Sequence, residues 1–168
     1  VDAAALNMGV TAENLHDKYP HLTKERADQY AVHSQAKYAA ALEAGNIEPD
    51  LVPVATRDPE HGWGLATGDE LARPGTTLAG CANLRTPFRP GGRVTAGNAS
   101  PLTDGATMAL IASGAKATEL GLCAKMKLVS YAFAGVDPAI MGYGPVPATT
   151  KALANAGLDI NDIGLFEI

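Results

Sequence analysis

The sequence has few aromatic residues, two cysteines and no long hydrophobic run, and each scarcity excludes a class of protein. Cys81 and Cys123 show no CxxC spacing and no histidine cluster stands near them, so neither a disulfide framework nor a metal site is expected. No apolar run approaches the roughly 20 residues that span a membrane. Residues 1–8 lack the basic and apolar regions of a signal peptide. We therefore expect a cytoplasmic protein with no membrane span and no bound metal.

The composition favours a layered α/β protein that binds no nucleic acid. The net charge of −5 argues against a general nucleic-acid binder. Aromatic residues make up only 5% of the chain, while alanine and glycine are abundant, and small residues suit helices that pack closely on sheets. At 168 residues the chain is one domain or pieces of two. It begins without methionine, so we expect it to be cut from something longer.

Two helices are expected in the first 45 residues. Thr11 is a suitable N-cap for a helix over 12–18, and Thr23 for a longer helix that ends at Gly45. The 3-4-7 spacing predicts a buried face of the longer helix made of Ala27, Tyr30, Ala31, Ser34, Tyr38, Ala41 and Leu42. We assign Glu25, Arg26, Asp28 and Lys37 to its solvated side. A short edge strand is expected at 50–54.

Residues 56–92 are expected to be irregular, with one helix at about 77–84. Segments of this kind are often functional or mobile. The basic residues of this region are Arg73, Arg85, Arg89 and Arg93. In an acidic chain such a cluster favours an anionic ligand such as a phosphate. The alternative is a solvated loop whose arginines pair with Asp69 and Glu70.

The run "VTAGNASPLTDGAT", residues 94–107, has almost no side-chain bulk. Gly97 and Gly105 would allow the backbone to approach another group closely. Asn98 and Ser100 would then offer short hydrogen bonds to a ligand lying against this backbone. The alternative is an ordinary turn that leads into a strand.

The remaining residues alternate between expected strands and helices. Strands are predicted at 106–112, 126–134 and 163–168. A helix at 114–120 is expected to end at Gly121, and a helix that begins near a proline is expected to end at Gly157. The last strand stops at the final residue, which we expect to reflect truncation.

Five segments in this order resemble the thiolase family: "NMGVTAEN", "TKERADQYAVHSQAKYAAALEAG", "RPGTTL", "VTAGNASPLTDGA" and "MGYGPVPATTKALANAGL". The resemblance covers essentially the whole chain and corresponds to a central part of a 3-ketoacyl-CoA thiolase or acetyl-CoA acetyltransferase. It implies an α/β fold, a part of the αβαβα layers of thiolases. Residues 1–101 would form the loop domain, 102–122 the end of the N-terminal core domain, and 123–168 the start of the C-terminal core domain.

The resemblance also implies which residues contact coenzyme A. The counterpart of Ser100 hydrogen-bonds to the pantetheine arm, and the counterpart of Arg73 lies by the nucleotide end. Phe88 and Met141 match residues that line the thioester end of the tunnel. Coenzyme A and acyl-CoA would be substrates, with no tightly bound cofactor. Proline stands at position 101 where the family usually has glycine, which departs from the pattern beside Ser100.

Thiolase catalysis uses an activated cysteine that accepts and passes on an acyl group. Neither Cys81 nor Cys123 stands in a thiolase catalytic motif, so we expect no catalytic residue in this chain and no activity of the chain alone. Asn7 replaces a histidine that is usual in biosynthetic members, which favours a degradative thiolase of fatty-acid β-oxidation. The parent would be a homo-oligomer, with membership of a β-oxidation multienzyme complex left open. The alternatives are a non-catalytic module that binds acyl-CoA or a partner subunit, and a remnant that does neither.

Overall fold

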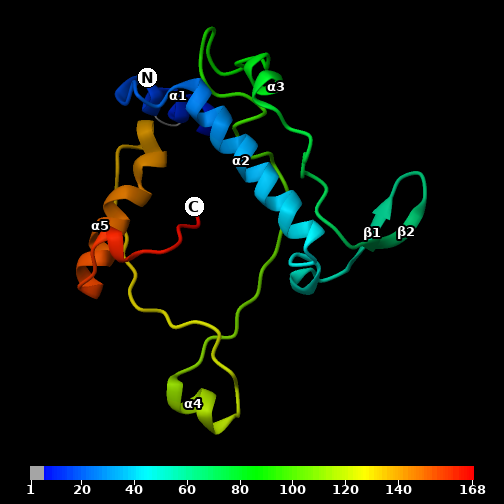
Figure 1. Ribbon diagram of the computed structural model, residues 1–168, viewed down its shortest axis with the longest axis vertical. Helices are drawn as coiled ribbons and strands as arrows, with labels where there is room; N and C mark the ends of the chain where they lie inside the picture. Colours follow the sequence, from blue (N-terminus) through cyan, green and yellow to red (C-terminus); the bar gives the residue numbers. More distant parts are fainter. Residues whose placement is uncertain (1–5) are drawn as a thin grey trace. The chain divides into compact units, whose positions relative to one another are not determined.

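The computed structural model describes residues 6–168 (Figure 1). The contacts within the chain divide it into two compact units. One unit comprises Val1–Leu15 and Leu102–Ile168, and the other comprises His16–Pro101. The first five residues of the expected loop domain lie outside the described residues. The elements are α1 (Met8–Lys18), α2 (Lys24–Glu43), η2 (Glu48–Asp50), β1 (Val54–Asp58), β2 (Gly62–Ala66), α3 (Leu78–Ala82), α4 (Gly114–Glu119), η3 (Pro138–Tyr143), α5 (Pro145–Ala156) and η4 (Ile160–Asp162).

Helix α1 begins earlier than the sequence predicted. Its first turn is capped by Asn7, whose Oδ1 accepts a hydrogen bond from the N–H of Val10 at 2.9 Å. Thr11 lies inside the helix, where its hydroxyl donates to the carbonyl oxygen of Met8. The prediction of Thr11 as the cap was wrong because asparagine is an equally good cap and stands one turn earlier.

Helix α2 has the predicted limits but not the predicted faces. Thr23 caps its start by accepting from the N–H of Arg26, and Gly45 follows its end with φ of 71°. Tyr30, expected to be buried, is 71% exposed, whereas Asp28, expected to be solvated, is 2% exposed. The helix therefore turns the charged Asp28 inward, where it contacts a loop that is distant in sequence.

A two-stranded antiparallel hairpin occupies part of the region predicted to be irregular. Strand β1 begins at Val54, so the strand expected at 50–54 was misplaced, and β2 was not foreseen. Asp58 closes the turn, because its Oδ1 accepts from the N–H groups of Glu60 and His61, each at 2.7 Å. The bond from the N–H of His61 is the main reason that the pKa of Asp58 lies below its usual value.

The later helices agree with the sequence, whereas the three later strands do not. Helix α4 is followed by Gly121 and α5 by Gly157, both with positive φ. Segments 106–112, 126–134 and 163–168 form no strand, and most of their side chains are exposed. A strand needs the N–H and C=O groups of a neighbour, and within residues 6–168 the sheet consists of β1 and β2 alone. Those three predictions were wrong for this structure because no pairing partner is present in the described chain.

Candidate functional site

The loop at 93–98 is a tight turn held by its own side chains. The N–H of Thr95 donates to Oδ1 of Asn98 at 2.8 Å, and the N–H of Asn98 donates back to the carbonyl oxygen of Thr95. The N–H of Gly97 donates to Oγ1 of Thr95. Thr95 is 1% exposed and Val94 is 6% exposed. The loop is therefore a folded and anchored element, not a loose connection.

Asn98 joins this turn to helix α2. Its Nδ2 donates to Oδ1 of Asp28 at 2.8 Å and to the carbonyl oxygen of Arg93 at 2.9 Å. Both polar atoms of the Asn98 amide are thus engaged inside the protein. The expectation that Asn98 would bond a ligand was wrong, since its side chain holds the turn and ties it to α2.

A buried ion pair completes this connection. Nζ of Lys24 lies 2.6 Å from Oδ2 of Asp28 and also donates to the carbonyl oxygen of Cys81 at 2.8 Å. The Asp28 side chain is 2% exposed and that of Lys24 is 23% exposed. Removing a carboxylate from water is costly unless it is paired and hydrogen-bonded. The Lys24 ammonium and the Asn98 amide together explain why Asp28 faces inward.

Gly97 provides the close approach that the sequence predicted. A Cβ at this position would lie 2.7 Å from Cδ1 of Leu84, which follows helix α3, and 3.1 Å from Sγ of Cys81, which lies in α3. Gly105 has no such role, because a Cβ there would have no atom within 4 Å and its φ is not positive. Gly97 therefore makes its close approach to the protein's own side chains and Gly105 makes none, while the approach of a ligand to this backbone stays a prediction.

We expect Gly97→Ala to lower the free energy of unfolding by about 1–3 kcal/mol, because the added methyl group overpacks the contact with α3. Gly105→Ala is the matched control and should raise stability by about 0.4–1 kcal/mol by restricting the unfolded chain. Urea unfolding of the complete protein measures both changes. Adding Leu84→Ala should recover part of the loss from Gly97→Ala, and equal effects of the two glycine substitutions would contradict the close approach.

Ser100 lies two residues beyond Asn98, at the exposed end of this anchored turn. Its hydroxyl has no hydrogen-bond partner within residues 6–168, so it can bond a ligand. Phe88 belongs to the same unit and is 40% exposed. The structure thus presents a free hydroxyl on a rigid loop and an accessible aromatic ring.

Arg73 is held through its backbone. Its N–H donates to Oε1 of Gln35 in α2 at 2.8 Å. Its Nη1 donates to the carbonyl oxygens of Glu70 and Ala72 at 3.2 and 3.1 Å. Within the described chain, no ion pair links this exposed guanidinium to the carboxylates of Asp69 or Glu70. It is thus available to an anionic ligand.

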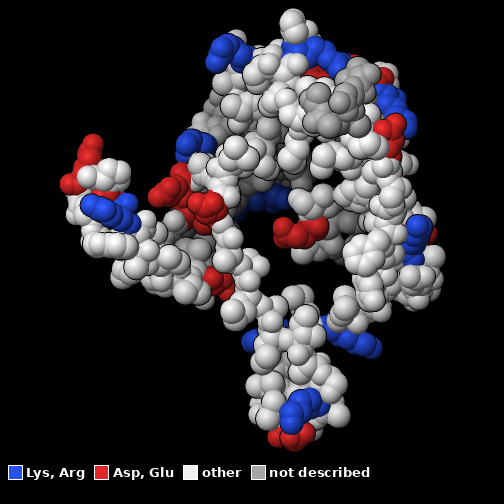
Figure 2. All heavy atoms as spheres, turned by 180° about the vertical axis from the view of Figure 1, so that it is seen from behind, with Lys and Arg blue, Asp and Glu red and all other residues white. Residues whose placement is uncertain are grey.

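The sequence left open whether the arginines of this region pair with Asp69 and Glu70 or bind an anion. Asp69 accepts a hydrogen bond from the hydroxyl of Tyr38 at 2.9 Å, which is the main reason that the pKa of Tyr38 is raised. Arg89 forms an ion pair with Asp17. Figure 2 shows basic and acidic side chains in small groups on the face in view. Arg73 therefore remains a candidate for an anion contact, as does the exposed Arg85.

Met141 lies in η3, in the other unit, and is 46% exposed. This segment is fixed by helix α1, because Nδ2 of Asn14 donates to the carbonyl oxygen of Ala139 at 2.9 Å. Gly142 also allows a close approach, since a Cβ there would lie 2.9 Å from Cδ1 of Leu15. Met141 is thus an accessible side chain on a well-supported segment.

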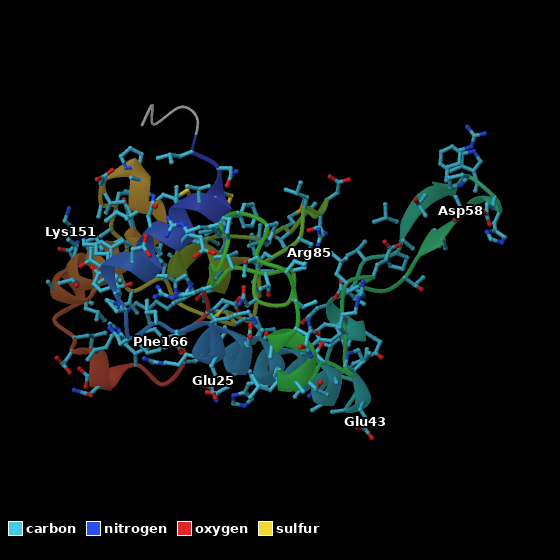
Figure 3. All side chains as sticks on the ribbon, turned by 90° about the horizontal axis from the view of Figure 1, so that it is seen from above. Glu25, Glu43, Asp58, Arg85, Lys151 and Phe166 are labelled. Carbon is cyan, nitrogen blue, oxygen red and sulfur yellow. The ribbon has the colours of Figure 1, made fainter. Side chains whose placement is uncertain are left out.

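Sequence reasoning placed Tyr38 on the inward face of α2 but missed the other residues of this helix that support the loops. Lys24, Asp28, Gln35 and Tyr38 occupy one face of the helix at intervals of four, seven and three residues, and all four bond to groups outside the helix. By contrast, Glu25 and Glu43 point into solvent (Figure 3). Polar residues at helical spacing were the available signal, but the pattern does not show which loop they meet.

Comparisons with known proteins identify relatives along the whole chain. The family model "Thiolase, N-terminal domain" matches residues 2–115, and "Thiolase, C-terminal domain" matches residues 122–168. A 3-ketoacyl-CoA thiolase of Saccharophagus degradans is 47% identical over 169 residues, covering 100% of this chain and 43% of that protein. An acetyl-CoA acetyltransferase of Pseudomonas aeruginosa is 48% identical over 162 residues, covering 96% of this chain and 41% of that protein.

Solved structures give a consistent result. The acetyl-CoA acetyltransferase of Bacillus anthracis matches with a TM-score of 0.82 and 37% identity, over 95% of this chain and 40% of that chain. Human mitochondrial 3-ketoacyl-CoA thiolase matches with a TM-score of 0.82 and 34% identity, over 98% of this chain and 41% of that chain. The chain spans about two-fifths of the length of these relatives.

Proposed function

Because the chain belongs to the thiolase family, we propose that it carries the coenzyme A-binding part of an acyltransferase. Its fold is a part of the α/β thiolase fold. Residues 1–101 would be the loop domain, 102–122 the end of the N-terminal core domain and 123–168 the start of the C-terminal core domain. The complete protein would transfer acyl groups between 3-ketoacyl-CoA or acetyl-CoA and coenzyme A, its substrates, with no tightly bound cofactor.

The observation that carries this proposal is the anchored turn at 93–98, which presents the free hydroxyl of Ser100. A narrow pantetheine arm can lie against a backbone with little side-chain bulk. Arg73 supplies a cation for the nucleotide phosphates, and Phe88 and Met141 supply exposed apolar surface for the thioester end. These four residues are the proposed coenzyme A contacts.

We further propose a degradative role in fatty-acid β-oxidation. The relatives carry both names, 3-ketoacyl-CoA thiolase and acetyl-CoA acetyltransferase. Asn7, the residue that favours the degradative type, caps α1 through its side chain. No helix within residues 6–168 has the length and apolar character that crossing a membrane requires. A cytoplasmic location, a homo-oligomeric parent and membership of a β-oxidation complex belong to the same proposal.

In the complete enzyme, Arg73→Ala should raise KM for coenzyme A by about three- to tenfold with little change in kcat, because binding lost equally from ground and transition states affects KM alone. The same substitution should raise KM for dephospho-coenzyme A by a smaller factor. Steady-state thiolysis of acetoacetyl-CoA measures both constants.

The matched control is Arg57→Ala in the hairpin strand β1, which should leave KM unchanged. An unchanged KM in the Arg73 variant would contradict the proposed anion contact and support a merely solvated loop. Binding of coenzyme A by a complete protein that catalyses no acyl transfer would favour the non-catalytic module instead.

A further inference from the structure

We propose that helix α2 is a template that sets the spacing between the two coenzyme A-contacting loops, and that Asp28 and Gln35 are the positioning residues through which it acts. The inference rests on the proposed function, because it takes Ser100 and Arg73 as residues that touch coenzyme A. Neither Asp28 nor Gln35 contacts the substrate in this proposal.

The first loop is positioned by Asp28. Its carboxylate accepts from Nδ2 of Asn98 at 2.8 Å and from Nζ of Lys24 at 2.6 Å, and its side chain is 2% exposed. The Asn98 amide in turn accepts from the N–H of Thr95, so the turn and the helix share one hydrogen-bond network. Ser100 follows two residues later. A shift of the Asp28 carboxylate would therefore move the backbone that carries the Ser100 hydroxyl.

The second loop is positioned by Gln35. Its Oε1 accepts from the N–H of Arg73 at 2.8 Å. The carbonyl oxygen of Arg73 accepts from the N–H of Thr76 at 2.9 Å and from its hydroxyl at 2.6 Å. The backbone of Arg73 is thus held on both sides, and its exposed guanidinium extends from a fixed point.

The two attachment points lie on one rigid element. Asp28 and Gln35 are seven residues apart, which is two helical turns on one face and about 10.5 Å along the axis. Helix α2 is capped at its start by Thr23 and followed at its end by Gly45, so this interval does not depend on loop conformation. Fixing both contacts in advance reduces the ordering that binding would otherwise require. The template would thus hold the pantetheine contact and the nucleotide contact at a fixed separation.

The test measures the dissociation constants of two probes, coenzyme A and pantetheine, which lacks the nucleotide, together with kcat in the complete thiolase. Gln35→Met keeps the side-chain length and removes the acceptor. It should weaken coenzyme A binding by about three- to tenfold, leave pantetheine binding and kcat unchanged, and add nothing in an Arg73→Ala background. Gln29→Ala is the control on the same helix, because within residues 6–168 the Gln29 amide bonds only to exposed Glu25, at 3.4 Å.

Asp28→Asn tests the other loop. It should weaken the binding of coenzyme A and of pantetheine by a similar factor, and it should have little further effect on either in a Ser100→Ala background. If the Asp28 variant does not fold, the measurements on Gln35→Met still test the proposal, because Gln35 has no part in the buried ion pair.

The outcomes separate the two proposals. If Arg73→Ala and Ser100→Ala both leave coenzyme A binding unchanged, the proposed function fails and the template fails with it. If these two variants weaken binding while Gln35→Met and Asp28→Asn do not, the template alone is overturned. A loss of pantetheine affinity in Gln35→Met equal to its loss of coenzyme A affinity would also overturn it, since that result indicates general loosening of the fold.

Discussion

Replacing Lys24 by methionine is expected to raise amide hydrogen exchange in the 93–98 turn by about a hundredfold, a loss of about 3 kcal/mol in local stability. Methionine keeps the methylene packing but removes the cation, and the Asp28 carboxylate stays buried at 2% exposure. Breaking a buried pair typically costs about 3–5 kcal/mol. We take the lower end because the Lys24 side chain is 23% exposed. The amide of Thr95 is the most informative probe, since it donates to Oδ1 of Asn98.

Matched variants distinguish the ion pair from general damage to α2. Asp28→Asn alone should lower the local stability of the turn less than Lys24→Met does, because the remaining Lys24 ammonium can turn toward water. Combining Lys24→Met with Asp28→Asn should be less damaging than Lys24→Met alone, since the second change removes the uncompensated charge. Lys37→Met, on the exposed side of the same helix, should leave exchange unchanged. Strictly additive effects of the two substitutions would show that Lys24 and Asp28 are not coupled.

Helix limits were the most predictable part of the fold because their signals are local. Thr23 accepts from an N–H three residues away, and Gly45, Gly121 and Gly157 supply the left-handed conformation that ends a helix. The error at α1 has the same origin, since two capping residues, Asn7 and Thr11, lie one turn apart and either satisfies the rule.

Burial and strand pairing were not predictable because they depend on distant partners. Asp28 faces inward owing to Asn98, 70 residues away, and Gln35 contacts Arg73, 38 residues away. The helical spacing of α2 alone favoured Tyr30 for the interior, although it is 71% exposed. The apolar segment at 126–134 has strand-like composition, yet no partner strand within residues 6–168. Of the candidate site, the bare loop and Gly97 could be inferred from sequence, whereas the network that holds the loop could not.

The complete thiolase is expected to keep its turnover when both cysteines of this chain are replaced, whereas residues 1–168 alone should show no thiolysis. A catalytic thiol must be accessible and within reach of a base. Cys81 is 3% exposed and packs beside Gly97, and Cys123 is exposed but lies in a segment that forms neither helix nor strand. No hydrogen bond within the described residues joins either Sγ to a histidine. We therefore expect neither thiol to be the acyl-accepting nucleophile.

The rate of thiolysis, followed as the loss of acetoacetyl-CoA absorbance in the presence of coenzyme A, tests this expectation. Cys123→Ser should leave kcat within about twofold of the unmodified enzyme, because substitutions at exposed sites seldom disturb the fold. Cys81→Ala should lower stability by about 1–3 kcal/mol through loss of buried contacts, again with kcat retained at a temperature where the enzyme is folded. The isolated chain should give no rate above the uncatalysed background at any concentration of coenzyme A. Thiolysis by this chain that Cys123→Ser or Cys81→Ala abolishes would place the nucleophile inside it and overturn the assignment of the catalytic residues to other parts of the protein.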